Sequence, residues 1–164
     1  GEGKDFEKPR FIGEALADSL NVYLPKIKTE NSITLSVVSV KLPLPEYHIR
    51  ITDHRGLTSS VSKKLLPYPM NPYLQAVRIG QFVWISAPAD FSGEYAVQIK
   101  NNLTAKGFQA NVSSFNGSYL GYIIPGRYFY LDEYESKTMG WFGPNMGEYT
   151  MDVIRRISEI ATSK

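Results

Sequence analysis

The sequence predicts an α/β fold in which helices pack on a mixed sheet of parallel and antiparallel strands. The clearest sign is a pair of apolar segments, residues 74–79 and 82–86, which flank Gly80-Gln81 and are typical of a tight β-hairpin. The second sign is the order strand, turn, helix, strand over residues 82–115, which predicts a right-handed βαβ unit with parallel strands. The hairpin adds an antiparallel neighbour to that unit, so the sheet is expected to be mixed.

The first half of the chain yields weaker predictions. Apolar residues at helical spacing predict a helix over residues 11–24 that ends at Pro25. Alternating apolar residues then predict strands, and polar or proline-rich stretches predict turns and loops. In order, we expect a strand over 33–42, an extended segment over 42–45, an alternating segment over 47–52, a turn over 53–56 and a surface loop or flap over 57–72.

The second half contains the helix of the βαβ unit and a closing helix. Helical spacing over residues 91–106 predicts a helix that Gly107 stops, and residues 108–115 form the next strand. A stretch rich in glycine and tyrosine follows. An amphipathic helix over residues 149–161 closes the chain.

Composition limits the class of protein. With 164 residues, of which 43% are hydrophobic and 21% charged, the chain suits a single globular domain spanning residues 1–164. The net charge is only +2 and the longest basic runs are pairs, which argues against nucleic acid as a partner. No stretch approaches the roughly 18 apolar residues of a membrane span. Cysteine is absent, which excludes disulfides and thiolate chemistry but leaves the compartment open.

Asp90 follows the second strand of the hairpin, where ligands gather in open α/β sheets. One interpretation is that Asp90 caps the following helix, because aspartate is among the best residues for satisfying the first N–H groups of a helix. The other is that it serves as a metal ligand or an acid/base carboxylate on a rigid turn. A single aspartate leaves both interpretations open.

The tyrosine-rich stretch also has two interpretations. Glycines interrupt residues 113–144, and the tyrosines follow neither a helical nor a strand period. They form either an aromatic loop packed on the core, or a lining for a sugar or lipid with phenols used as ligands and hydrogen-bond donors.

The sequence lacks the common catalytic motifs. His48 and His54 have no partner at zinc-ligand spacing, so we expect both to be surface residues. There is no G-x-S-x-G nucleophile elbow and no phosphate-binding G-x-x-x-x-G-K-[ST] loop.

Taken in order, several short segments between Ala76 and Tyr149 resemble the neutral (alkaline, non-lysosomal) ceramidases. Each segment is weak alone, but the shared order and similar spacing make the resemblance specific. The segments are Ala76-Val-Arg-Ile-Gly-Gln-Phe-Val-Trp-Ile, Ala87-Pro-Ala-Asp-Phe-Ser-Gly-Glu94, Asn116-Gly-Ser-Tyr-Leu-Gly-Tyr122, Asp132-Glu-Tyr-Glu135 and Phe142-Gly-Pro144.

The resemblance implies a zinc-dependent amidase that hydrolyses the N-acyl bond of ceramide or a related lipid amide. Asp90 falls where that family has a metal-binding glutamate, and Tyr122 falls on its metal-binding tyrosine. Tyr134, which follows Tyr122 by 12 positions, falls on a tyrosine that contacts the substrate amide near the metal. The family also implies an extracytoplasmic (secreted or periplasmic) parent.

Two departures shape the expectation. Pro88-Ala-Asp90 replaces the family's Pro-Gly-Glu, which shortens the carboxylate by one methylene and makes Glu94 the nearest substitute. The family's histidine ligands precede this region and are absent here, so Asp90 and Tyr122 supply two of the roughly three protein ligands that a catalytic zinc needs. We therefore expect this chain alone to bind zinc poorly and to hydrolyse nothing.

Two hypotheses follow. In the first, the chain is the C-terminal part of the catalytic domain of a ceramidase-like amidase and works only with its missing N-terminal part. In the second, it is a non-catalytic lipid- or glycan-binding domain on a degenerate ceramidase scaffold.

Overall fold

The computed structural model describes residues 6–52, 55–66 and 71–163 and divides into two units, Gly1–Ile33 and Thr34–Lys164. In the first unit, α1 (Glu7–Tyr23) is followed by the 3₁₀ turn η1 (Leu24–Lys26), so the helix ends just before Pro25 as the sequence predicts. α1 begins earlier than predicted, because a proline in the first turn, here Pro9, breaks no helical hydrogen bond. None of its residues is buried.

The second unit is built on a four-stranded mixed sheet, which confirms the predicted fold class. Its order is β1 (Leu35–Lys41), β4 (Tyr73–Ile79), β5 (Phe82–Ser86) and β7 (Gln109–Ser113). β4 pairs antiparallel with both β1 and β5, which confirms the hairpin. β5 and β7 are parallel and are joined through α3 (Gly93–Thr104), which confirms the βαβ unit.

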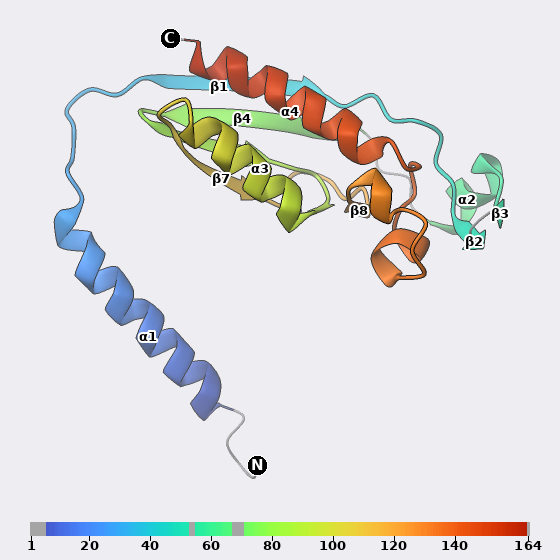
Figure 1. The fold of residues 1–164 in the computed structure, drawn as a ribbon, viewed down its shortest axis with the longest axis horizontal. Coiled ribbons are helices and arrows are strands. Elements are labelled where there is room, and N and C mark those ends of the chain that lie inside the picture. The colour runs from blue at the N-terminus through green and yellow to red at the C-terminus, as the bar shows by residue number, and fades with distance from the viewer. Residues whose placement is uncertain (1–5, 53–54, 67–70, 164) are drawn as a thin grey trace. The chain divides into compact units, whose positions relative to one another are not determined.

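Two helices cover one face of this sheet, α3 beside β7 and α4 (Met146–Thr162) across β1 and β4 (Figure 1). The strand residues that point toward them alternate with exposed ones, as expected for a sheet with one packed face. The fully buried members are Leu74, Ala76, Val83 and Ile85 from the strands and Ile154 and Ile157 from α4.

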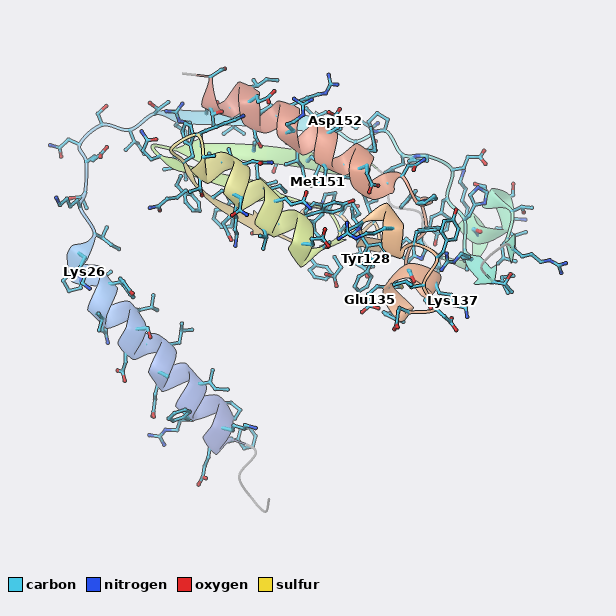
Figure 2. The ribbon with its side chains drawn as sticks, in the orientation of Figure 1. Lys26, Tyr128, Glu135, Lys137, Met151 and Asp152 are labelled. Carbon is cyan, nitrogen blue, oxygen red and sulfur yellow. The ribbon has the colours of Figure 1, made fainter. Side chains whose placement is uncertain are left out.

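The exposed side of α4 carries ion pairs. Asp152 pairs with Arg155 and with Arg156 at 2.8 Å each, and Figure 2 labels Asp152 on this helix.

Among the described residues of this unit, no helix covers the opposite face of the sheet, and part of that face is apolar. Val37, Val77 and Trp84 stand in one row across three strands, because the register places them opposite one another. Val37 is 60% exposed and Trp84 45% exposed. Contiguous apolar surface of this kind usually marks an interaction site.

The prediction of a surface loop or flap over residues 57–72 is wrong in part, because the chain forms the helix α2 (Ser59–Leu65) there. Ser62 of α2 is fully buried; its hydroxyl accepts a hydrogen bond from the Ile49 amide at 3.0 Å and donates to the Leu57 carbonyl at 3.4 Å. These contacts with an earlier segment stabilise a short helix that the local sequence alone does not predict. Pro67 and Pro69 lie outside the described residues.

Two small ribbons flank the main sheet. The alternating segment 47–52 shortens to β2 (Arg50–Thr52), which pairs with β3 (Arg55–Gly56); His54 lies outside the described residues. β6 (Asp90–Phe91) pairs in parallel with β8 (Tyr122–Ile123).

The tyrosine-rich stretch beyond β8 contains two short helical turns, η2 (Gly126–Tyr128) and the π-helical η3 (Tyr134–Thr138). Figure 2 labels Tyr128 of η2 and both Glu135 and Lys137 of η3 in this region. No helix among the described residues is long and apolar enough to span a bilayer.

Candidate functional site

The segment from Ala87 to Ser92 is held by backbone hydrogen bonds on two sides. On one side, the amide of Ala87 donates to the Ser113 carbonyl at 2.9 Å, and the carbonyl of Ala89 accepts from the Phe115 amide at 3.0 Å. On the other side, the amide of Asp90 donates to the Gly121 carbonyl at 2.9 Å. A segment paired in this way is rigid, and a rigid backbone gives the Asp90 carboxylate a fixed position.

The helix-cap interpretation of Asp90 is wrong. The N-cap of α3 is Ser92, and no side chain donates or accepts a capping hydrogen bond there. Asp90 instead lies in β6, opposite Tyr122 of β8. The strand pairing therefore directs Asp90 toward the tyrosine-rich stretch rather than toward the first turn of the helix.

Gly121 allows Tyr122 to reach this position. It has a φ of +71°, a conformation that residues with a Cβ rarely adopt. An added Cβ would lie 2.3 Å from the Met139 carbonyl oxygen and 3.2 Å from the Trp141 ring. The chain comes this close because the Tyr122 amide donates a hydrogen bond to that same Met139 carbonyl at 3.1 Å.

Asp90 and Tyr122 form the centre of the candidate site. The Tyr122 hydroxyl donates a hydrogen bond to the Asp90 carboxylate, which raises the pKa of Tyr122 to about 12, with smaller contributions from desolvation and the Asp90 charge. Deprotonating the phenol would place two negative oxygens side by side. A cation bound between these oxygens would reverse that effect, because it favours the ionised form of both groups.

Tyr134, at the start of η3, completes the set that the sequence predicts. Its ring meets the Tyr122 ring edge to face, with centroids 5.9 Å apart, and its side chain is exposed. The structure thus brings Asp90, Tyr122 and Tyr134 together, although 44 positions separate Asp90 from Tyr134. The roles assigned to them stay predictions.

Tyr119 and Trp141 also belong to this cluster, and the sequence analysis did not single them out. Burial raises the pKa of Tyr119 first, and the nearby Asp90 charge raises it further. The Tyr119 ring stacks on Phe115 at 5.6 Å and meets Trp141 edge to face at 5.8 Å. The one feature of the local sequence that could have pointed to Tyr119 is its position three residues before Tyr122. The sequence around Trp141 has no feature that links it to this site.

Glu94, the nearest substitute for Asp90 as a ligand, is engaged elsewhere. Its carboxylate forms an ion pair with Arg127 and accepts hydrogen bonds from Tyr128 and Gln98 at 3.3 Å each. The Arg127 guanidinium is the main reason that the pKa of Glu94 lies below its ordinary value. Of the two carboxylates, Asp90 is the one that contacts Tyr122.

Glu148 ties α4 to this end of the molecule. Its Oε1 atom accepts hydrogen bonds from the Tyr95 hydroxyl and from the Gly126 amide, both at 3.0 Å. Desolvation pushes the pKa of Glu148 up, but these hydrogen bonds outweigh it, so the pKa lies below its ordinary value of 4.5. These interactions therefore favour the ionised form of the Glu148 carboxylate.

We expect Glu148→Gln to lower the free energy of unfolding by about 1 kcal/mol at pH 7, a value reduced for solvent exposure. A depressed folded-state pKa stabilises the protein above the unfolded value and loses that contribution as the pH falls through the folded value. The difference between the two proteins should therefore shrink below the ordinary Glu148 value of 4.5. Urea unfolding at pH 7 and pH 3.5 measures this difference.

Glu159→Gln is the control, because it alters exposed ion pairs of the same helix. It should change the free energy of unfolding by less than about 0.5 kcal/mol. Equal losses of stability in the two variants would contradict the role of Glu148.

The donor set fits part of a zinc site. Asp90 and Tyr122 place a carboxylate oxygen and a phenol oxygen within hydrogen-bonding reach of each other. Oxygen donors this close can bind one ion, and zinc accepts oxygen, nitrogen and sulfur ligands. Among the described residues, no group of three or more His, Cys, Asp or Glu side chains is placed to hold a metal. Further ligands would have to come from outside this set.

His48 lies away from this cluster. The structure leaves it exposed, as predicted, with Nδ1 3.1 Å from the Leu57 carbonyl and Nε2 3.5 Å from the Glu46 carboxylate.

The fold is similar to that of solved ceramidases. One is neutral ceramidase from Pseudomonas aeruginosa, with a TM-score of 0.53 and 18% sequence identity over 78% of this chain and 28% of that chain. Another is a ceramidase complexed with C2, with a TM-score of 0.47 and 25% identity over 62% of this chain and 18% of that chain. No family model and no curated protein matches the sequence. The chain thus spans 28% of the length of the bacterial enzyme and has the fold of a part of neutral ceramidase, which confirms the resemblance at the level of fold.

Proposed function

We propose that this chain is the C-terminal part of the catalytic domain of a ceramidase-like, zinc-dependent amidase that hydrolyses the N-acyl bond of ceramide or a related lipid amide. The observation that carries the proposal is the convergence of Asp90, Tyr122 and Tyr134 on a fold shared with neutral ceramidase. The cluster includes a hydrogen-bonded pair of oxygen donors and an exposed phenol beside it.

In this proposal Asp90 and Tyr122 supply two zinc ligands, and the remaining ligands come from the missing N-terminal part of the same domain. Zinc, when bound, would polarise the amide carbonyl and lower the pKa of its water toward about 7. Without the ion, the hydrogen bond between the Tyr122 hydroxyl and Asp90 keeps the two oxygen donors next to each other. The exposed Tyr134 hydroxyl donates a hydrogen bond to the amide oxygen as negative charge develops on it.

The open face of the sheet offers a place for the missing part. Its apolar row of Val37, Val77 and Trp84 resembles the half of an interface that a second layer would cover. Since this chain covers 28% of the bacterial ceramidase, most of a catalytic domain of that kind would lie outside it. The isolated chain is therefore expected to be inactive, and the full-length parent is the protein to assay. An extracytoplasmic parent belongs to the same proposal through the family resemblance.

The test is the zinc content and N-acyl-sphingosine hydrolysis of the full-length parent, compared with its Asp90→Ala and Tyr122→Phe variants. We expect about one zinc per parent chain and a loss of metal or of activity by at least a factor of about 100 in both variants. Tyr149→Phe is the matched control. Its hydroxyl makes no hydrogen bond with another described residue, and its substitution should leave zinc content and rate unchanged.

A parent that binds no zinc, with both variants behaving like it, would sink the amidase proposal. A non-catalytic lipid- or glycan-binding role would then take its place. The substitution of aspartate for the family's glutamate at position 90 is the observation that favours this second candidate.

A further inference from the structure

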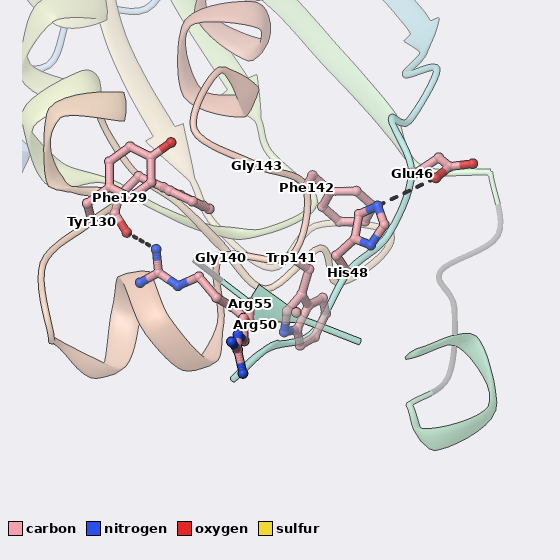
Figure 3. Close-up of a pocket in the computed structure, with 11 residues that line it drawn as sticks. Glu46, His48, Arg50, Arg55, Phe129, Tyr130, Gly140, Trp141, Phe142 and Gly143 are labelled. Carbon is pink, nitrogen blue, oxygen red and sulfur yellow. Dashed lines mark hydrogen bonds and ion pairs between the residues drawn. The ribbon is translucent and has the colours of Figure 1, made fainter. Parts of the chain in front are cut away.

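A second pocket, which shares Trp141 with the tyrosine cluster, lies where β2 and β3 meet the segment after η3. Its volume is about 320 Å³, within the range of roughly 300–1,000 Å³ typical of small-molecule sites. Figure 3 shows the residues that line it. Those used below are Glu46, His48, Arg50, Arg55, Trp141 and Gly143.

Arg50 is a fixed cation at this pocket. Its Nη1 and Nη2 atoms donate to the Phe129 and Leu131 carbonyls, and its guanidinium lies 4.6 Å from the centroid of the Phe129 ring. Its Nε atom is buried and has no hydrogen-bond partner among the described residues. These contacts hold the charge in place, and neither the carbonyls nor the ring carries a net charge. The carboxylate of Asp132 also interacts with Arg50, but its main partner is Lys137.

Arg55 adds a second guanidinium. It is exposed and forms no ion pair or hydrogen bond with a described residue through its side chain. Among the described residues of the pocket wall, the one carboxylate belongs to Glu46, which already faces the His48 ring at 3.5 Å. The described lining therefore carries two arginines against one carboxylate.

Gly143 lets a ligand come close to the backbone of the lining. It lines the pocket, and an added Cβ there would meet no described atom within 4 Å. The amides of Trp141 and Phe142 before it donate no backbone hydrogen bond to a described residue. Free amides beside arginines are suited to binding an anion.

We propose that this pocket binds a phosphate group, carried by a phosphate ester or present as inorganic phosphate. A dianion suits two guanidinium groups better than a singly charged carboxylate does, because the exposed Arg55 guanidinium can contact two of its oxygens and Arg50 adds a second positive charge. Trp141 lines this pocket, and its ring also contacts Tyr119 of the candidate functional site. Phosphate binding by this pocket and the amidase activity proposed for the parent are separate properties, so either proposal can fail alone.

Trp141 offers a direct readout on this chain. The sequence has two tryptophans, and Trp84 lies on the open face of the sheet, so Trp84→Phe leaves Trp141 as the sole indole. We expect inorganic phosphate, titrated at constant ionic strength, to change the Trp141 fluorescence saturably. In the same background, Arg55→Ala should weaken binding by a factor of about 10, because a charge-assisted hydrogen bond is lost. The Arg55 side chain makes no hydrogen bond or ion pair with a described residue, so this variant should fold normally.

Two controls make the test decisive. Lys100→Ala removes an exposed charge from α3 and should leave the phosphate affinity unchanged. Acetate at the same ionic strength should bind at least about 10 times more weakly than phosphate. The proposal is overturned by a signal that does not saturate, by equal affinities of the Arg55→Ala and Lys100→Ala variants, or by equal binding of acetate. A phosphate monoester with a larger alcohol distinguishes the sources: tighter binding than inorganic phosphate identifies the ester as the ligand, and weaker binding identifies the free ion.

Discussion

Replacing Gly121 with alanine is expected to lower the free energy of unfolding of the second unit by about 3 kcal/mol, and the melting temperature by roughly 10 °C. Two penalties add. The φ of +71° costs about 1–2 kcal/mol for a residue with a Cβ. The new Cβ would also lie 2.3 Å from the Met139 carbonyl oxygen, so the two segments would have to separate. That separation would displace Tyr122, whose amide bonds to the same carbonyl. Urea unfolding at neutral pH measures the loss.

Gly117→Ala is the matched control for this prediction. Gly117 has a φ of +77°, close to that of Gly121, but an added Cβ there meets no atom within 4 Å. It should therefore show the conformational cost alone, about 1 kcal/mol. The difference between the two variants isolates the cost of the close approach to Met139. If they lose equal stability, the packing argument for Gly121 fails.

Replacing Tyr47 with alanine is expected to cost about 3–5 kcal/mol, as for other large buried aromatic residues. Tyr47 is fully buried, and its ring meets Trp141 edge to face at 5.3 Å and Phe142 at 5.7 Å. The next residue, His48, donates its amide to the Trp141 carbonyl at 2.9 Å. The Tyr47 ring thus anchors the segment that leads to Arg50, and its loss should also weaken phosphate binding at the second pocket.

Tyr47→Phe separates the ring from the hydroxyl. It keeps the aromatic contacts, so we expect a loss of about 1 kcal/mol and little change in phosphate affinity. Thermal unfolding followed by near-ultraviolet circular dichroism reports on both variants, because the ring packs against Trp141. A loss as large for phenylalanine as for alanine would show that the hydroxyl, rather than ring packing, anchors the segment.

The sequence by itself determined the elements whose signals are local. The hairpin on either side of Gly80-Gln81 and the helix between β5 and β7 follow from apolar periodicity and from turn residues, which act within a few positions. The resemblance of ordered motifs placed Asp90, Tyr122 and Tyr134 in one site, and the structure brings them together. Their chemical roles stay predictions.

Only the tertiary structure decided the features that depend on distant contacts. Asp90 could cap a helix by local rules, but pairing with Tyr122 holds it in β6 and leaves Ser92 at the N-cap. α2 forms where a loop was predicted, because Ser62 bonds to the distant Ile49 amide. The second pocket joins Arg50 to residues some 90 positions later. Hydrogen bonds and burial between segments far apart in sequence exceed local preferences of a few tenths of a kcal/mol per residue, and local patterns carry no record of them.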